Sequence, residues 1–305
     1  VLVGIAAIGL MLTLIKDFAS LIAPIFLMLN MMITAYPLYR VLRRVRVPKA
    51  IAATLTGLTV LLVLALFVYG MYWAVEAMVY KLPDYADQFQ ALYNESLAML
   101  ERAGLTVDSL TQQVKSIDPQ SVASAGLNVL EGLSSIGSLI AVAVTALIFM
   151  MMDTPEMEER MQIARRTHGG FVDALSNFAQ GIRRYWIVTT VFGLIVAVLD
   201  WVVLEGLGVP LALVWGIFSF LTNYIPNIGF VIGLIPPALL ALVDQGPKTA
   251  LAVIIAYCVL NFVVQSIIQP KVAGNAVGLT PTMSFISLML WTAVLGPLGA
   301  LLALP

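Results

Sequence analysis

Long apolar runs separated by short polar stretches make up most of the chain. A helix needs about 20 consecutive apolar residues to cross the hydrocarbon core of a bilayer. Five runs approach this length: Phe18–Leu38, Ala50–Trp73, Leu133–Met152, Tyr185–Val203 and Thr249–Ile268. We interpret a shorter run before them, Val1–Ile15, as the end of a first spanning helix. The pattern predicts an all-α polytopic integral membrane protein with about five to eight membrane segments.

Two further apolar stretches, 209–243 and 280–305, are interrupted in the middle by proline and glycine. In the first stretch, Tyr224–Gly229 separates two runs that are each too short to span a bilayer. Backbone opened at that depth is tolerated only where it is buried in protein or lines a wet cavity. Paired broken segments of this kind point to the binding site of a secondary transporter. Both stretches are therefore predicted to be re-entrant helical hairpins.

The two hairpins share a proline spacing. Pro210 and Pro226 are separated by the same number of positions as Pro281 and Pro297. Each hairpin follows one spanning segment, and the first hairpin starts on the outer side whereas the second starts on the inner side. This alternation predicts an inverted repeat, an arrangement in which substrate is held where the two units meet.

Composition narrows the class of protein. Of the 305 residues, 61% are hydrophobic and 11% are charged, and the mean hydropathy is +0.98. An average soluble domain is about 25% charged, so a water-soluble fold is excluded. The formal net charge of -1 argues against nucleic acid as a partner. Cys258 and His168 are the single residues of their types, so the sequence predicts no disulfide, no metal site and no cofactor.

Basic residues are concentrated in 40–49 and 155–184, which are predicted to be cytoplasmic loops because such loops keep an excess of Lys and Arg. By contrast, the segment 76–131 is acidic and is predicted to form amphipathic extramembrane helices. The resulting organisation is a scaffold region at 1–152, an amphipathic linker at 153–184 and a transport core at 185–305. Thr154 is the predicted N-cap of the linker helix, with Pro155 in its first turn.

Polar residues and helix breaks inside the apolar core are the candidate substrate ligands. The tip of the first hairpin would expose free backbone groups, and Asn261, Gln265 and Gln269 recur every fourth residue along one helical stripe. The full set of substrate-binding candidates is Asn223, Pro226, Asn227, Gly229, Asn261, Gln265, Gln269, Thr292, Gly296 and Pro297. A tight turn without a ligand and hydrogen bonds between helices remain the alternative interpretations. Close helix packing is the expected role of the small-residue pair Gly229 and Gly233.

Asp200 is the acid of the transport-core spans and is the candidate for ion coupling. Carboxylates inside a membrane segment are functional hypotheses by default. Its position near the end of a span, next to Trp201, also fits an ordinary interfacial residue.

Three stretches carry a resemblance to a known family: YIPNIGFVIGLIPP at 224–237, NFVVQSIIQPKVAGNAVGLTP at 261–281 and LGPLGALLALP at 295–305. In this order they resemble the autoinducer-2 exporter family of bacterial polytopic transporters. The resemblance implies a bacterial cytoplasmic (inner) membrane protein that exports a small furanone-type quorum-sensing signal. It also implies a mobile transport domain, an elevator movement and a homo-oligomer such as a pentamer. An acid often found near the QPKV motif is replaced here by Gln265 and Gln269, which weakens the case for ion coupling at that point.

The sequence therefore predicts a secondary transporter that exports a small polar molecule, with the lipid bilayer and protons or sodium as further partners. A sodium or lithium/proton antiporter is the alternative, and a non-transporting scaffold built on 76–131 is a third hypothesis. Motifs of catalysis and nucleotide binding, such as HExxH, GxSxG and a phosphate-binding loop, are missing from the sequence, so an enzyme is not predicted.

Overall fold

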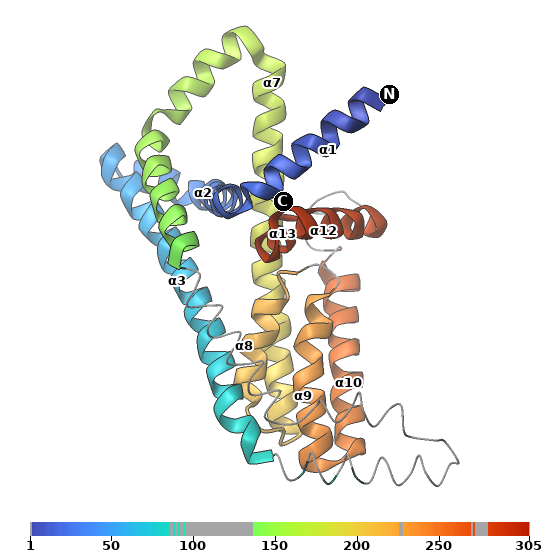
Figure 1. Cartoon of the computed structure of the whole chain (residues 1–305). Coiled ribbons are helices and arrows are strands. Elements are labelled where there is room, and N and C mark those ends of the chain that lie inside the picture. Colours follow the sequence, from blue (N-terminus) through green and yellow to red (C-terminus); the bar gives the residue numbers. More distant parts are fainter. Residues whose placement is uncertain are drawn as a thin grey trace.

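The computed structural model describes residues 2–85, 88, 91, 94, 137–225, 228–269, 271 and 280–304. Within these residues the protein is helical and contains no strand (Figure 1). The elements are α1 (Leu2–Asp17), α2 (Ala19–Arg44), α3 (Lys49–Lys81), the 3₁₀-helix η1 (Leu82–Tyr85), α7 (Gly137–Gly206), α8 (Ala212–Thr222), α9 (Gly229–Gln245), α10 (Pro247–Asn261), the π-helix η2 (Phe262–Ile268), α12 (Pro281–Leu295) and α13 (Pro297–Leu302). The predicted amphipathic helices of 76–131 fall mostly outside the described residues.

Four helical segments in the described part of the chain are long and apolar enough to cross a membrane: α2, α3, the apolar part of α7, and α10 continued by η2. On α3, Leu58, Leu62 and Leu66 are exposed along one face, whereas Thr56 and Val60 on another face are buried. An exposed leucine stripe of this length is suited to lipid rather than water. The structure thus confirms the all-α polytopic fold.

The first basic segment, 40–49, is helical up to Arg44 rather than a loop, and the second, 155–184, is helical, as the predicted linker helix implies for its first part. α2 continues through Arg40 and Arg43 to Arg44, and only the residues before Lys49 form the turn into α3. Segment 155–184 lies entirely within α7. Arginine and lysine stems are good helix formers, and charged heads at a membrane boundary are solvated whether the backbone is helical or not.

α7 consists of two helical stretches that meet at a kink at His168, where the backbone leaves helical geometry (φ -133°, ψ 51°). The predicted helix start at Thr154 is wrong, because the Thr154 hydroxyl donates to the carbonyl of Met150 inside the helix. Pro155 is accommodated within the same helix. α7 also runs without interruption from the predicted linker into the predicted transport core at 184/185.

Both broken hairpins are present. α8 and α9 are separated by the turn that follows Thr222, and α12 and α13 are separated by Gly296, whose φ is 68°. The hairpins close in the same way, because a Cβ at Gly229 would overlap the carbonyl of Thr222, and a Cβ at Gly299 would overlap that of Trp291. In each hairpin a glycine of the second helix therefore lies directly against the last turns of the first helix.

The two hairpins meet at the turn of the first one. Ile225 and Ile228 pack against Leu288, Ala300 and Ala303 of the second hairpin. Figure 1 shows α12 and α13 lying across the end of α8, α9 and α10 at which the first hairpin turns. The inverted orientation of the two units in a bilayer stays a prediction.

Two hydrophobic cores hold the first hairpin in place. Leu204 of α7, Trp215 of α8, Leu240 of α9 and Tyr257 of α10 lie in one core. On the opposite side, Tyr224 belongs to the core shared by α2, α3 and α7. The described residues of the hairpin are therefore packed between α10 and the long helices α2, α3 and α7.

Candidate functional site

Three of the predicted substrate ligands form one hydrogen-bonded group, which we call the amide cluster: Asn223, Asn261 and Gln265. The Gln265 side-chain amide donates to Asn223 Oδ1 over 2.7 Å and to Asn261 Oδ1 over 2.8 Å. Asn261 in turn donates to the carbonyl of Tyr257 over 2.9 Å. The amide cluster thus connects the turn of the first hairpin to the helix that follows it.

Backbone geometry places each member of the amide cluster. Asn223 caps the C-terminus of α8, where its N–H bonds the carbonyl of Ser219. Its side chain lies over Gly193 of α7, where a Cβ would come within 2.5 Å of Asn223 Nδ2. Gln265 lies in the π-helix η2, a wide-turned geometry that occurs frequently at functional sites.

The residue after Asn223 attaches the hairpin turn to α7. The Tyr224 hydroxyl and the Thr190 hydroxyl are 2.9 Å apart. The Tyr224 ring contacts the rings of Phe67, Trp186 and Phe220. Thr190 and Gly193 are one turn apart on α7, so the same face of this helix holds both residues of the turn.

Asp200 belongs to a second polar group, formed with Ser219 of α8. Its side chain is 0% exposed, and Oδ2 accepts a 2.6 Å hydrogen bond from the Ser219 hydroxyl. Oδ1 has no hydrogen-bond partner among the described residues, and neither does the buried hydroxyl of Tyr257. Asp200 is therefore enclosed by protein, whereas its depth in the membrane stays a prediction.

Sequence reasoning missed Ser219 and Tyr257. Tyr257 precedes Asn261 by four positions, so it extends the Asn261, Gln265 and Gln269 stripe by one turn and could have been found from this spacing. Ser219 gives no such signal, because one hydroxyl in an apolar helix is commonly bonded to its own backbone.

The remaining candidates do not join the amide cluster in the described part of the structure. Gln269 is half-buried and forms no side-chain hydrogen bond there. Thr292 has a buried hydroxyl without a partner among these residues. Gly296 and Pro297 form the break of the second hairpin.

Gly229 and Gly233 serve helix packing, since Gly233 faces Ser219 and Thr222 of α8 as the small-residue spacing predicts. Pro226 and Asn227 lie outside the described residues.

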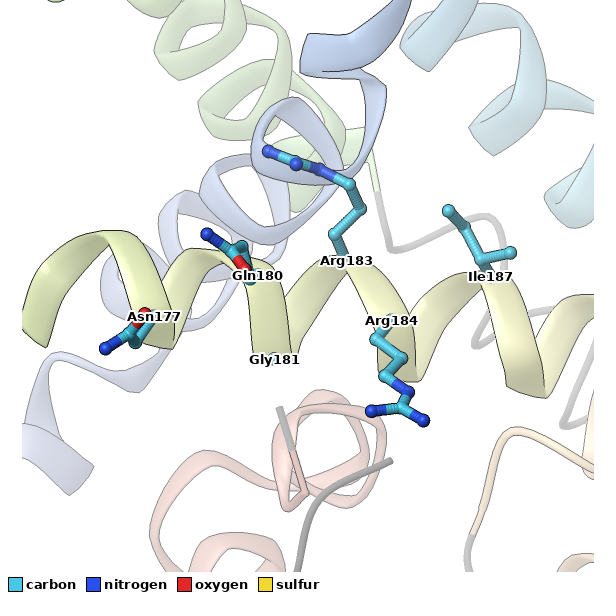
Figure 2. Close-up of a pocket in the computed structure, with 6 residues that line it drawn as sticks. All are labelled: Asn177, Gln180, Gly181, Arg183, Arg184 and Ile187. Carbon is cyan, nitrogen blue, oxygen red and sulfur yellow. The ribbon is translucent and has the colours of Figure 1, made fainter. Parts of the chain in front are cut away.

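A cavity of about 490 Å³ lies beside α7, next to the C-terminal part of the basic segment 155–184. It is lined by Asn177, Gln180, Gly181, Arg183, Arg184 and Ile187. Figure 2 shows Arg183 and Arg184 pointing in different directions from α7, with Arg183 directed toward α2 and Arg184 toward the C-terminal helices. All six lining residues belong to α7, and Ile187, the last of them, comes one turn before Thr190.

The polar atoms of the site are the oxygen and nitrogen atoms of side-chain amides, hydroxyls and one carboxylate. Within the described residues there is no group of three or more His, Cys, Asp or Glu side chains that could hold a metal ion. Neutral amides both donate and accept hydrogen bonds, and they therefore match hydroxyl and carbonyl groups of a solute. A single buried carboxylate flanked by hydroxyls is the other chemically distinct feature.

Comparisons with known proteins agree with this architecture. The sequence family described as AI-2E family transporter matches residues 2–305. The chain is 30% identical to the AI-2 transport protein TqsA of Escherichia coli (strain K12) over 293 residues, which cover 95% of this chain and 84% of the relative. It is 29% identical over 309 residues to a putative transport protein of Haemophilus influenzae, covering 100% of this chain and 89% of the relative. The putative transport protein YhhT of E. coli K12 is 26% identical over 305 residues, covering 100% and 87%.

Proposed function

Because the chain belongs to the AI-2E transporter family, we propose that it is a secondary transporter that moves a small polar molecule outward across the bacterial inner membrane. The observation that carries this proposal is the amide cluster, in which Gln265 joins the turn of a broken hairpin to a π-helix. Polar side chains in an apolar helical protein occur mainly where a solute or ion passes or where helices are held together.

The cargo we propose is hydroxyl-rich and uncharged or weakly charged, like the autoinducer-2 signal named for the TqsA relative. Asn and Gln amides can exchange the hydrogen bonds that they make with one another for bonds to hydroxyl and carbonyl groups. This exchange would keep the amide groups that it involves hydrogen-bonded before and after binding, so the cost of desolvating them stays low.

Alternating access by an elevator-type movement is the proposed mechanism. One feature supports it: the two broken hairpins meet at the turn next to the amide cluster. Close glycine packing keeps each hairpin compact enough to move as a unit. We further propose a homo-oligomer, with segments 40–49 and 155–184 on the cytoplasmic side.

The test is metabolite profiling of the medium from cells that lack the protein, express it, or express the Asn223→Ala variant. Wild-type protein should enrich a hydroxylated furanone or similar solute in the medium, and Asn223→Ala should remove the enrichment. An equal enrichment by Asn223→Ala would exclude the hairpin turn from the solute site. The sequence-based prediction for Asn227→Ala is the same loss.

A sodium or lithium/proton antiporter is the second candidate function. The observation that favours it is Asp200, a fully buried carboxylate with one oxygen that has no hydrogen-bond partner among the described residues. A buried acid either takes up a proton or pairs with a cation, because an isolated charge is costly in an apolar interior. Exchange of a proton for a cation at one carboxylate is the elementary step of such an antiporter.

A further inference from the structure

Three arginines converge on a second cavity between α2 and α7, apart from the amide cluster. This cavity, of about 170 Å³, is lined by Pro37, Arg40, Val41, Arg44 and Arg183. The four α2 residues follow a spacing of three, one and three positions, so they share one face of the helix. Arg183 comes from α7, and Figure 2 shows its side chain extending toward α2.

Pro37 explains why Arg183 lies there. A proline inside a helix has no N–H, so the carbonyl four residues earlier loses its helical partner. In α2 that carbonyl belongs to Ile33, and Arg183 Nε donates to it over 3.2 Å. The arginine is thus fixed against α2 through one nitrogen, which leaves the other end of its guanidinium available to the cavity.

Positive charge at this cavity is only partly balanced. Arg40 approaches Glu158 at 3.8 Å, and Glu158 also accepts a 2.7 Å hydrogen bond from Tyr36. Neither Arg44 nor Arg183 has a salt bridge to an acid within the described residues. Like charges four positions apart on a helix repel, so an anion between these arginines would be stabilised.

We propose that this cavity binds the phosphate group of an anionic phospholipid. The arginines would contact the phosphate through their planar donor forks, which match its oxygens. Pro37, Val41 and the alkyl stems of the arginines supply apolar walls that suit the glycerol and first methylenes of a lipid better than a free ion. A water molecule takes about 30 Å³ of liquid, so the cavity of about 170 Å³ has the volume of about six water molecules, enough for a phosphate ester.

The position agrees with a lipid ligand. The cavity lies at the basic end of the membrane-spanning part of α2, and basic pockets between transmembrane helices on the cytoplasmic side bind acidic headgroups. A role in membrane orientation would require only that the arginines lie near the membrane surface. Here Arg183 of α7 instead bonds Ile33 of α2, 150 positions earlier, so the two helices form the cavity together. This inference is independent of the cargo.

The test uses the full chain purified in detergent, with the thermal midpoint followed by tryptophan fluorescence. Dihexanoyl phosphatidylglycerol, dihexanoyl phosphatidylcholine and inorganic phosphate are titrated separately. Phosphatidylglycerol should raise the midpoint, and the other two should have little effect. Arg44→Gln should weaken the apparent affinity roughly fivefold and Arg40→Gln/Arg44→Gln more, since each basic residue near an acidic lipid contributes about that factor.

Arg166→Gln is the matched control, because Arg166 is an exposed arginine of α7 outside both cavities. An equal response to phosphatidylcholine, an equal response to inorganic phosphate, or an unchanged response in Arg40→Gln/Arg44→Gln would each overturn the proposal. Intact-protein mass spectrometry gives a second measurement, the number of phosphatidylglycerol molecules bound. Arg44→Gln alone suffices if the double variant does not fold, since Arg44 is exposed and its loss leaves no buried group unpaired.

Discussion

The Ser219 hydroxyl donates a 2.6 Å hydrogen bond to Asp200 Oδ2, and this bond connects α8 to the C-terminal part of α7. Ser219 also lies against Gly233 of α9, so the same residue joins both arms of the first hairpin to the long helix. The contact matters because Asp200 is the buried carboxylate of the core and Ser219 is its hydrogen-bond donor among the described residues.

Replacing Ser219 by alanine should destabilise the protein by about 1–3 kcal/mol, because it leaves a buried carboxyl group without its donor. The measurement is the thermal midpoint of the purified protein in detergent. In an Asp200→Ala background the same Ser219→Ala change should cost much less, since the partner is already gone. Equal costs in the two backgrounds would show that the hydrogen bond is not the cause.

Asp200→Asn should uncouple transport from ion gradients, because it keeps the shape of the side chain but removes the group that exchanges a proton. In proteoliposomes, cargo should still equilibrate downhill through the variant but should no longer accumulate when a pH or sodium gradient is imposed. Accumulation equal to that of the wild type would remove Asp200 from the coupling step.

The same variant separates the two candidate functions. For a sodium/proton antiporter, adding sodium to vesicles without organic cargo should change the signal of an internal pH dye, and Asp200→Asn should abolish that change. A wild-type protein that gives no such response without cargo favours the exporter.

Gln265→Leu should lower export by roughly tenfold or more, because it removes two hydrogen bonds of the amide cluster and leaves buried acceptors unpaired. Gln269→Leu is the matched control with the same change one helical turn further on. Since Gln269 forms no side-chain hydrogen bond among the described residues, its effect should be small. Similar losses in both variants would indicate that the whole stripe, rather than the amide cluster, carries the function.

Gly229→Ala should destabilise the first hairpin by at least about 1–3 kcal/mol, because the added methyl would overlap the Thr222 carbonyl and force the helices apart. Gly206→Ala is the control, since nothing lies within 4 Å of the position of its Cβ. The readout is the fraction of folded protein recovered from the membrane together with its thermal midpoint. A Gly229→Ala protein as stable as Gly206→Ala would contradict the close packing of α8 against α9.

The apolar pattern was sufficient to predict the spanning helices and both broken hairpins, because the length and composition of a membrane segment are set by the bilayer itself. It failed at 40–44, which continue α2, and at the helix start predicted at Thr154, because helix and loop are equally compatible with solvated charge. A proline such as Pro155 signals a first turn in an isolated helix, but neighbouring groups can satisfy the backbone when it falls within a longer one.

The amide cluster was predicted in part. The four-residue spacing was sufficient to place Asn261 and Gln265 on one stripe, and Asn223 was a candidate from its position before the break. Their contact depends on Gly193, which makes room for Asn223 from a helix 30 positions earlier, and no local pattern encodes this approach. The partnership of Asp200 and Ser219 was likewise not predictable, since it depends on how α7 and α8 pack.

α7 makes two of the contacts described above, with Arg183 bonded to α2 and Asp200 bonded to the first hairpin. The helix between these two residues is unbroken over about 25 Å, so Arg183 and Asp200 are held in a fixed position relative to each other. The kink in α7 is at His168, on the N-terminal side of Arg183, where the backbone leaves helical geometry. If the first hairpin moves as proposed, its displacement would be transmitted along this helix to Arg183, and a lipid bound at the arginine cavity would oppose that displacement.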